Sequence, residues 1–198
     1  MADADVNFNL YLIREFLDPI SCRKIIDELS CNSQSPATVY GLSETAAVDD
    51  KVRKTTSLTP GAETLQSIDQ QLLRVRDQIA AHFDLQLDRT EDPQFLRYRE
   101  GDFFVAHQDG NTGLLLSERE QFRKISIVVF LNKETEVPEP GCFGGGSLVF
   151  TEWRAGRNQG QYRLTPEVGM LVAFPSETTH EVIPVTCGER YSIVTWFG

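Results

Sequence analysis

The sequence has few basic residues for its acidic content. Among its 198 residues, 19 Lys and Arg stand against 29 Asp and Glu, which gives a formal net charge of -10. Such a balance repels a phosphate backbone, so we expect no nucleic-acid partner. The sequence also begins without a long hydrophobic run, since MADADVNFNLYLIREFL starts with acidic residues and predicts neither a signal peptide nor a membrane span. We therefore expect a cytoplasmic protein with no membrane partner.

Cysteine is also scarce. The four cysteines, Cys22, Cys31, Cys142 and Cys187, contain no CxxC pair. Reduced thiols are the expectation and a set of disulfides is the alternative. We find no phosphate-binding loop, nucleophilic triad, internal repeat or low-complexity tract. With 40% hydrophobic residues the chain is long enough to bury a core, and it predicts a single domain over residues 1–198.

The front of the chain, about residues 1–90, carries helical signals. Asp18 followed by proline predicts a helix start, because its side chain can cap free amides and proline costs nothing in the first turn. After a polar stretch from Asn32 to Lys54, Pro60 opens a second helix that should run to about His82. Apolar residues at roughly helical spacing predict the buried stripes of the two helices: Ile20, Ile25, Ile26 and Leu29, then Leu65, Ile68, Leu72, Leu73, Val75 and Ile79.

The rest of the chain, about residues 95–198, changes to short β-prone runs separated by turn residues. The runs are FLRYR, FFVAH, ISIVVFLN, SLVFTEW, QYRLT, MLVAF, HEVIPV and RYSIVTWF. Helices followed by antiparallel strands indicate an α+β fold, a double-stranded β-helix (jelly roll) core with N-terminal supporting helices. The longest irregular stretches, Gly110 to Arg123 and Asn132 to Gly146, are predicted strand connections that could also act as mobile loops.

Three residues form a candidate metal site. The sequence has three histidines, and one begins the segment His107-Gln108-Asp109. On a strand, alternate side chains share a face, so His107 and Asp109 can point at one ion. His180 supplies a third ligand from a strand that folding could place opposite the first. Two histidines and a carboxylate form the facial triad of oxygen-activating Fe(II) sites, which leaves positions open for a bidentate cosubstrate and dioxygen.

Arg190 strengthens this interpretation. Its strand alternates Arg190, Ser192, Val194 and Trp196 on one face, and both faces are largely apolar. A buried guanidinium needs a charged partner, and a cosubstrate carboxylate would satisfy it in two parallel hydrogen bonds, with the Ser192 hydroxyl adding a donor. Pairing of Arg190 with an Asp or Glu of the protein is the equally weighted alternative.

The chain as a whole resembles the 2-oxoglutarate/Fe(II) dioxygenases, and within them the prolyl 4-hydroxylase-like group. The tail HEVIPVTCGERYSIVTWF looks like that group's last two core strands, and LRYREGDFFVAHQD looks like the segment that leads into the first metal ligands. ISIVVFLN and GGGSLVF are similar to the strands that follow. The resemblance covers about residues 95–198 and is loose in the front third.

The resemblance implies site roles at matching positions. His107, Asp109 and His180 would be the iron ligands, and Arg190 would bind the far carboxylate of 2-oxoglutarate. Tyr98 would lie beside the cosubstrate, with a core aromatic as its alternative role. Two further residues would lie at the substrate: Trp196, which is otherwise a core aromatic, and Arg123, which is otherwise a solvated loop charge.

One position departs from the family pattern. Several animal prolyl hydroxylases carry a Tyr just before the LN of ISIVVFLN, where its hydroxyl binds the far carboxylate, and here that residue is Phe130. We expect weaker cosubstrate binding unless Ser192, Thr195 or another hydroxyl substitutes.

The resemblance implies an oxygenase that uses Fe(II), 2-oxoglutarate and O2, with ascorbate as reductant, and releases succinate and CO2. A peptidyl proline is the expected substrate, and a free amino acid or another small molecule is the alternative. A non-catalytic metal-binding jelly-roll module and a cupin-like enzyme with another metal are further alternatives. The oligomeric state is not readable from the sequence.

Overall fold

The computed structural model describes residues 8–37, 51–110, 122–137, 139–154 and 157–198. Two helices and fourteen strands lie in these ranges. In chain order they are β1 (Tyr11–Ile13), α1 (Pro19–Cys31), β2 (Gln34–Pro36), β3 (Arg53–Lys54), β4 (Thr56–Leu58), α2 (Ala62–Phe83), β5 (Gln94–Tyr98), β6 (Phe103–His107), β7 (Ile125–Phe130), β8 (Phe143–Gly145), β9 (Leu148–Arg154), β10 (Arg157–Leu164), β11 (Leu171–Pro175), β12 (Thr179–Val182), β13 (Val185–Gly188) and β14 (Arg190–Phe197).

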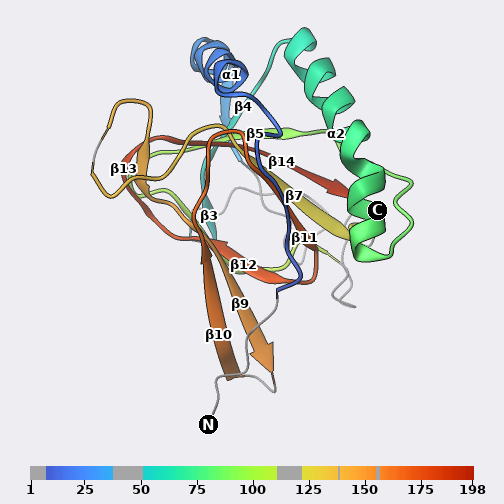
Figure 1. Ribbon diagram of the computed structural model, residues 1–198. Coiled ribbons are helices and arrows are strands. Elements are labelled where there is room, and N and C mark those ends of the chain that lie inside the picture. Colours follow the sequence, from blue (N-terminus) through green and yellow to red (C-terminus); the bar gives the residue numbers. More distant parts are fainter. Residues whose placement is uncertain (1–7, 38–50, 111–121, 138, 155–156) are drawn as a thin grey trace.

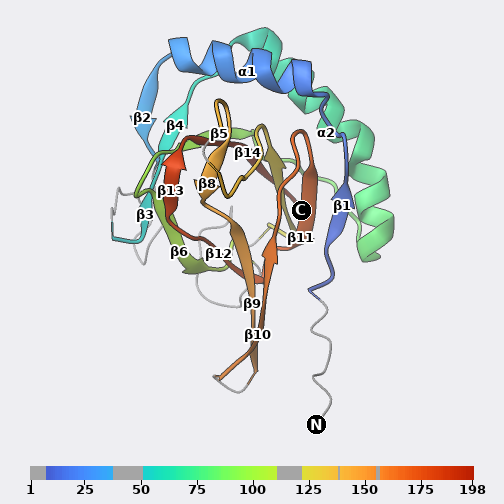
Figure 2. The ribbon, with the colours of Figure 1, turned by 60° about the vertical axis from the view of Figure 1, so that its left-hand side comes forward.

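Two antiparallel sheets form a jelly roll. The larger sheet has seven strands in the order β1-β11-β7-β14-β5-β4-β2, and the smaller has five in the order β10-β9-β12-β6-β3 (Figure 1). A third sheet consists of β13 and β8 alone. The β9–β10 hairpin extends well beyond the rest of the strands (Figure 2). The eight β-prone runs of the sequence correspond to β5, β6, β7, β9, β10, β11, β12 and β14, so the expected strand-rich core is present.

The front of the chain contributes strands as well as helices, which the sequence did not predict. β4 pairs with β5, and β2 pairs with β4, so both extend the larger sheet. β3 pairs with β6 and forms one edge of the smaller sheet. These strands lie within or just after the polar stretch Asn32 to Lys54, where short edge strands show little hydrophobic alternation. The front is therefore part of both sheets and is not wholly helical.

Local capping explains where the helices begin. The Asp18 carboxylate accepts hydrogen bonds from the backbone N–H groups of Ile20 and Ser21, at 2.9 and 3.0 Å, so α1 begins at Pro19 as expected. α2 begins at Ala62, slightly after the expected Pro60. The backbone N–H of Gly61 donates to Glu28 in α1, which ties the start of α2 to α1.

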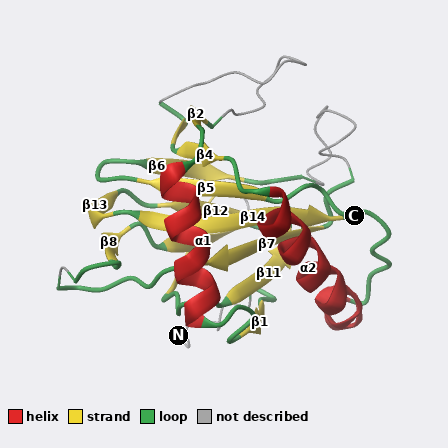
Figure 3. Cartoon of the chain, turned by 90° about the horizontal axis from the view of Figure 1, so that it is seen from above, coloured by secondary structure: helices red, strands yellow, loops and turns green. Residues whose placement is uncertain are grey.

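Both helices pack on one face of the larger sheet (Figure 3). Their buried residues are Cys22, Ile25 and Leu29 in α1, and Ile68, Leu72 and Ile79 in α2. Two of the predicted stripe residues point outward instead, because Ile20 is 69% exposed and Leu73 is 48% exposed. A helix turns by about 100° per residue, so Ile20 lies about 140° around the helix from Ile25, and Leu73 lies about 100° from Leu72.

A separate hydrophobic core packs against each face of the larger sheet. One core lies between the helices and the sheet and includes Leu29, Leu72, Tyr191 and Ile193. The other lies between the two sheets and includes aromatic side chains from both, such as Phe130 from β7 and Phe150 from β9. Alternate residues of β14 therefore enter different cores, as its sequence predicted, and β14 is buried on both sides.

Three further expectations have clear outcomes. All four cysteines are free thiols, so the disulfide alternative is wrong, and burial raises the pKa of the Cys22 thiol to about 11. The stretch Asn132 to Gly146 is not wholly irregular, because β8 lies within it and pairs with β13. Residues 111–121 of the other stretch lie outside the described residues. In the part of the chain that is described, no helix has the length and apolarity to cross a membrane.

Candidate metal centre and active site

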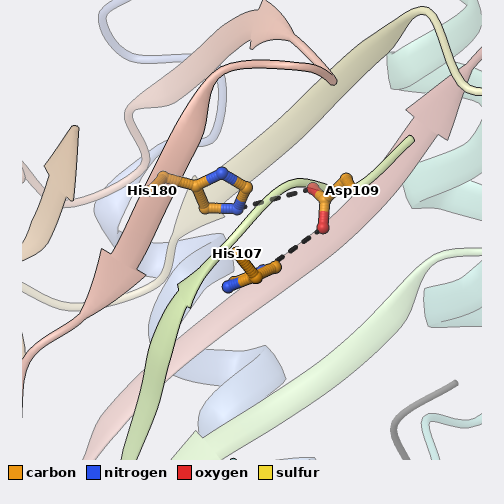
Figure 4. Close-up of side chains that lie close together, drawn as sticks. All are labelled: His107, Asp109 and His180. Atoms are coloured by element: carbon orange, nitrogen blue, oxygen red, sulfur yellow. Dashed lines mark ion pairs between the residues drawn. The ribbon is translucent and has the colours of Figure 1, made fainter. Parts of the chain in front are cut away.

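The side chains of His107, Asp109 and His180 converge on one point (Figure 4). The two histidines are direct cross-strand neighbours on β6 and β12, and their ring centroids are 4.3 Å apart. Asp109 Oδ1 lies 3.3 Å from His107 Nε2, and Asp109 Oδ2 lies 3.5 Å from His180 Nε2. One ligand atom from each residue can be chosen so that all lie within 4.8 Å of one another. That spacing suits a single metal ion bound by all three side chains.

Backbone carbonyl groups orient both imidazole rings. His107 Nδ1 lies 2.8 Å from the carbonyl oxygen of Val105, and His180 Nδ1 lies 2.9 Å from that of Thr178. A carbonyl oxygen only accepts, so each Nδ1 carries the proton and donates. In a neutral imidazole with its proton on Nδ1, Nε2 keeps a lone pair, and in both residues the Nε2 atom faces Asp109. A metal-ligating histidine is oriented in this way by the hydrogen bond of its other ring nitrogen.

Asp109 reaches the site from outside the strand. β6 ends at His107, so Asp109 is not held by strand alternation as the sequence suggested. Instead, the backbone N–H groups of Asp109 and Gly110 donate to the carbonyl oxygen of Ser176, at 2.8 and 3.2 Å. The side chain of Asp109 also accepts a hydrogen bond from Ser126, at 2.7 Å. The ligand-bearing segment is thus fixed to the residue that follows β11 and to β7.

The protonation states favour cation binding. Burial by itself would raise the pKa of Asp109, but the nearby His180 and His107 lower it well below its usual range. Burial and the neighbouring His107 lower the pKa of His180 to about 4, although Asp109 acts in the opposite direction. Near neutral pH the carboxylate is therefore charged and His180 is neutral, which is the state that a metal ion requires.

A cavity of about 220 Å³ lies between the two sheets and includes the three side chains. Its walls come from β5, β7 and β14 of the larger sheet and from β3, β6, β9 and β12 of the smaller one. All five remaining candidate residues of the sequence line this cavity: Tyr98, Arg123, Arg190, Ser192 and Trp196.

Arg190 is a fully buried cation in this cavity, with only 1% of the residue exposed. Its Nη1 donates to the Ser192 hydroxyl at 2.9 Å, and its Nε has no hydrogen-bond partner among the described residues. Its guanidinium carbon lies 5.1 Å from the ring centroid of Tyr98 and 5.2 Å from that of Phe130. Burial lowers the pKa of Arg190, while Tyr98 and Glu134 act in the opposite direction. Among the described residues no carboxylate forms an ion pair with Arg190, so the alternative of a protein carboxylate partner finds no support in this part of the chain.

Arg123 is buried and paired with a carboxylate, so it is not a solvated loop charge. Its Nε and Nη2 donate to the two carboxylate oxygens of Glu91, at 2.6 and 2.9 Å. Its guanidinium carbon lies 3.7 Å from the ring centroid of Trp196, and its Nη1 donates to the carbonyl oxygen of Asp109 at 3.3 Å. Arg123 thus connects the indole of Trp196 to the segment that carries Asp109.

The family follows from comparison with known proteins. The family model described as the 2OG-Fe(II) oxygenase superfamily matches residues 93–198, which is more than half of the chain. The chain belongs to the 2OG-Fe(II) oxygenase superfamily. Within that superfamily it is similar to the prolyl 4-hydroxylase-like group, as its sequence motifs predicted.

This 2OG-Fe(II) oxygenase has curated relatives among the PKHD-type hydroxylases. The protein of Acidovorax ebreus is 25% identical over 182 residues, which cover 91% of this chain and 75% of the relative. The protein of Shewanella sp. (strain ANA-3) is 35% identical over 104 residues, which cover 52% of this chain and 41% of the relative. The 35% identity is thus confined to about half of this chain and to less than half of the Shewanella protein.

Solved structures of similar fold include two prolyl hydroxylases. A Pseudomonas putida prolyl-4-hydroxylase has a TM-score of 0.65 at 26% identity, and the match covers 96% of this oxygenase and 92% of that chain. A Trichoplax adhaerens prolyl hydroxylase, solved with a peptide of hypoxia inducible factor, has a TM-score of 0.66 at 17% identity and covers 96% and 83%. At that identity the second likeness establishes the fold alone.

The residues of this oxygenase fit the cofactors of its superfamily. Two imidazole nitrogens and one carboxylate make a donor set typical of non-haem Fe(II), and the described part of the site contains no thiolate that would favour zinc. The unpaired Nε of Arg190 is a buried donor that a carboxylate would satisfy. The donor set and the unpaired Nε are both properties of the protein's own side chains.

Several residues around the site were not predicted. Ser126 and Ser176 contact the Asp109 segment, and Glu91 pairs with Arg123. Ser126 could have been noticed as the polar residue in the apolar run ISIVVF, since a buried hydroxyl needs a partner. Nothing in the local sequence singles out Glu91 or Ser176, because each meets its partner through tertiary contacts.

Proposed function

We propose that this chain is a Fe(II)- and 2-oxoglutarate-dependent dioxygenase that hydroxylates a C–H bond of a peptidyl proline and releases succinate and CO2. The observation that carries the proposal is the buried Arg190 guanidinium, which has an unpaired Nε and shares one cavity with the His107, Asp109 and His180 triad. A cavity that combines a metal-ligand set with an anion-binding cation suits a cosubstrate with a metal-chelating end and a carboxylate end.

Each residue has a proposed role. His107, Asp109 and His180 hold Fe(II), and Arg190 with Ser192 binds the far carboxylate of 2-oxoglutarate. Tyr98 lies against the cosubstrate. Trp196 and Arg123 line the substrate side, where Arg123 acts through its stack on the indole ring.

The protein's own contribution to the reaction is to position and to shield the reactants. Bound Fe(II) with 2-oxoglutarate and dioxygen supplies the oxidising chemistry, with ascorbate as the proposed reductant. Arg190 fixes one end of the cosubstrate, and the Nδ1 hydrogen bonds of the two histidines fix the directions of the metal-binding lone pairs. The cavity lies between the two sheets, and apolar side chains such as Leu96, Val128 and Leu148 form the part of its wall that limits the access of water.

The proline substrate rests on similarity. The Pseudomonas putida protein, matched over 96% of this chain at 26% identity, is a prolyl-4-hydroxylase. A free amino acid or another small molecule is the second candidate, and a small cavity of about 220 Å³ among the described residues favours it. The cytoplasmic location, the single domain over residues 1–198 and the lack of a nucleic-acid partner stay predictions.

The test is the conversion of 2-oxoglutarate to succinate by the purified protein with Fe(II), ascorbate and oxygen. Wild type is compared with His180→Ala, Arg190→Lys and the control Arg14→Lys, whose side chain is exposed and paired with Glu167. We expect turnover by wild type and by the control, none by His180→Ala, and a raised KM for 2-oxoglutarate in Arg190→Lys. A mass increase of one oxygen on proline-containing peptides, and not on free amino acids, would identify the substrate class.

A wild-type protein without turnover, and without a colour change when 2-oxoglutarate is added to the anaerobic Fe(II) protein, would contradict the proposal. The non-catalytic metal-binding module would then be the better description. Metal-dependent activity that needs no 2-oxoglutarate and is indifferent to Arg190→Lys would instead indicate the cupin-like alternative.

A further inference from the structure

Two buried serines lie behind the carboxylate of Asp109. The Ser126 hydroxyl donates to Asp109 Oδ2 at 2.7 Å, and the hydroxyls of Ser126 and Ser176 are 3.0 Å apart. Both serines have 0% exposure. Ser126 lies on β7 of the larger sheet, and Ser176 directly follows β11, the neighbouring strand. The two serines thus meet the metal-ligand residue from the sheet that does not carry the two histidines.

The hydrogen-bond inventory fixes the direction of this chain. A hydroxyl has one proton to donate, and an ionised carboxylate can only accept. Because Ser126 gives its proton to Asp109, the proton between the two serines must come from Ser176. The donors therefore run from Ser176 to Ser126 to Asp109 Oδ2. Each hydrogen bond in such a chain polarises the next one.

Ser176 also holds the backbone of the same ligand. Its carbonyl oxygen accepts from the N–H groups of Asp109 and Gly110. Asp109 is therefore restrained at its backbone and at one of its two carboxylate oxygens. Each carboxylate oxygen faces a histidine, because Oδ1 lies 3.3 Å from His107 Nε2 and Oδ2 lies 3.5 Å from His180 Nε2. Of the two oxygens, only Oδ2 accepts a hydrogen bond from a serine.

We propose that Ser126 and Ser176 are positioning residues that make Asp109 a one-oxygen metal ligand. The hydroxyl chain keeps Oδ2 occupied, so that Oδ1 is the oxygen offered to the metal. A carboxylate that bound through both oxygens would take one more coordination position, and the proposed function needs the open positions for the cosubstrate and dioxygen. The inference rests on the proposed function, since it concerns the same metal site.

A purely structural role makes a different prediction. Buried hydroxyls that only satisfy one another between β7 and the end of β11 would affect folding stability and nothing else. Ser147 is a matched example elsewhere in the molecule, because it is also 0% exposed and its hydroxyl donates to the carboxylate of Glu134 at 2.7 Å. Ser147→Ala is therefore the control for the loss of a buried hydroxyl that faces a carboxylate.

The experiment is a titration of the metal-free protein, residues 1–198, with Co(II), followed by visible absorbance, with a thermal melt of each apoprotein. We expect Ser126→Ala to bind Co(II) about 10- to 100-fold more weakly than wild type, because the loss of an outer hydrogen-bond partner of a ligand has that effect. Its Co(II) spectrum should also differ, since the freed carboxylate can bind through both oxygens. Ser147→Ala should keep the wild-type affinity and spectrum whatever happens to its melting temperature.

Ser176→Ala gives a second and independent arm. It should weaken Co(II) binding less than Ser126→Ala does, because it acts through the Ser126 hydroxyl. The double variant should bind no more weakly than Ser126→Ala alone, since the effect of Ser176 passes through a group that is already missing.

Two results overturn the inference alone. In the first, wild type binds Co(II) while Ser126→Ala shows the same affinity and spectrum. In the second, Ser126→Ala and Ser147→Ala lose affinity equally. A wild-type protein that binds no divalent ion overturns the proposed function and the inference together, so the two failures are distinguishable.

Discussion

Phe130 is the residue at which the sequence departs from the motif that it otherwise resembles. The ring lies 5.2 Å from the guanidinium carbon of Arg190, is fully buried and carries no donor. A far carboxylate of 2-oxoglutarate bound at Arg190 would therefore meet an apolar ring at the position where several animal prolyl hydroxylases carry a tyrosine hydroxyl. The Ser192 hydroxyl, already in contact with Arg190 Nη1, is the nearest replacement.

Restoring that hydroxyl should tighten cosubstrate binding. We expect Phe130→Tyr to lower the KM for 2-oxoglutarate about fivefold with little change in kcat, because one added hydrogen bond contributes about 1 kcal/mol. Phe95→Tyr is the control, since it adds the same hydroxyl on the helix-facing side of the larger sheet. Steady-state kinetics with varied 2-oxoglutarate measures both variants, and an unchanged KM in Phe130→Tyr would show that Phe130 is not at the carboxylate.

The lowered pKa of His180 predicts how the metal-free protein responds to acid. Its folded-state pKa is about 4, against an ordinary value of 6.5, so the unfolded chain binds more protons between these values. Stability should therefore fall as the pH is lowered from about 6.5 to 4, by about 1 to 3 kcal/mol. Urea unfolding in the presence of a chelator measures the free energy of unfolding at each pH. In His180→Ala this free energy should fall less over the same pH range. A wild-type stability that is flat over this range would contradict the prediction.

Residue roles were predictable where chemistry and spacing coincide. His107, His180 and Arg190 are rare or costly residue types in apolar strands, and the structure gathers them with Asp109 around one cavity. The contacts that orient them were not predictable. Ser176 and Glu91 are residue types found throughout the chain, and every residue has a backbone carbonyl like that of Val105. Their function depends on tertiary distance, which a single sequence does not contain.

At the scale of an element, the turn between β8 and β9 is another feature whose role depends on tertiary contacts. Gly145 and Gly146 both have positive φ, and a Cβ on Gly146 would meet Val185 at 2.8 Å and the Cδ of Arg190 at 3.2 Å. The glycine-rich sequence therefore allows the turn to pack against the buried stem of Arg190. Bulk at this turn would act on the site directly.

Two glycine variants separate backbone strain from this contact. Gly141 has φ +76 and open space within 4 Å of the point where a Cβ would lie, whereas Gly146 has φ +62 and crowded surroundings. Each Gly→Ala change should cost about 1 to 3 kcal/mol of backbone strain. Only Gly146→Ala should also raise the KM for 2-oxoglutarate, by about tenfold, since it displaces Arg190. Equal KM values in the two variants would contradict the proposed packing role.

Elements were predictable to different degrees. The eight β-prone runs are strands because their branched and aromatic residues are buried, and the Asp18 cap fixed the start of α1. The strands β2, β3 and β4 were missed, since their short polar sequences form strands only by pairing with β5 and β6 or with each other. Ile20 and Leu73 were placed on the wrong helix face because hydrophobicity alone does not fix the phase of a stripe.

At the scale of the whole molecule, the candidate metal site joins the two sheets. His107 and His180 come from the smaller sheet, while Asp109 is held by Ser126 and Ser176 at the larger one. A metal ion at this point would connect the two layers across the inner core. Loss of the metal ion should therefore lower the stability of the whole fold.

We therefore expect metal to raise the thermal stability of the protein. A free metal concentration 100 times the Kd stabilises the folded state by about 2.7 kcal/mol, which corresponds to a melting temperature about 5 to 11 °C higher in a chain of this size. Differential scanning calorimetry with Mn(II) and with a chelator measures the shift. His180→Ala is the control and should show little or none, and an equal shift in that variant would place the metal elsewhere.

The position of β14 also matters for how the chain folds during synthesis. β14 is the middle strand of the seven, and it pairs with β5 on one side and β7 on the other, both of which are made earlier. Until the ribosome has released residues 190–197, each of these hydrophobic strands has an unpaired edge. Unpaired edges promote aggregation, and pairing between segments so distant in sequence is slow. The nascent chain should therefore depend on chaperones most strongly just before its central strand emerges.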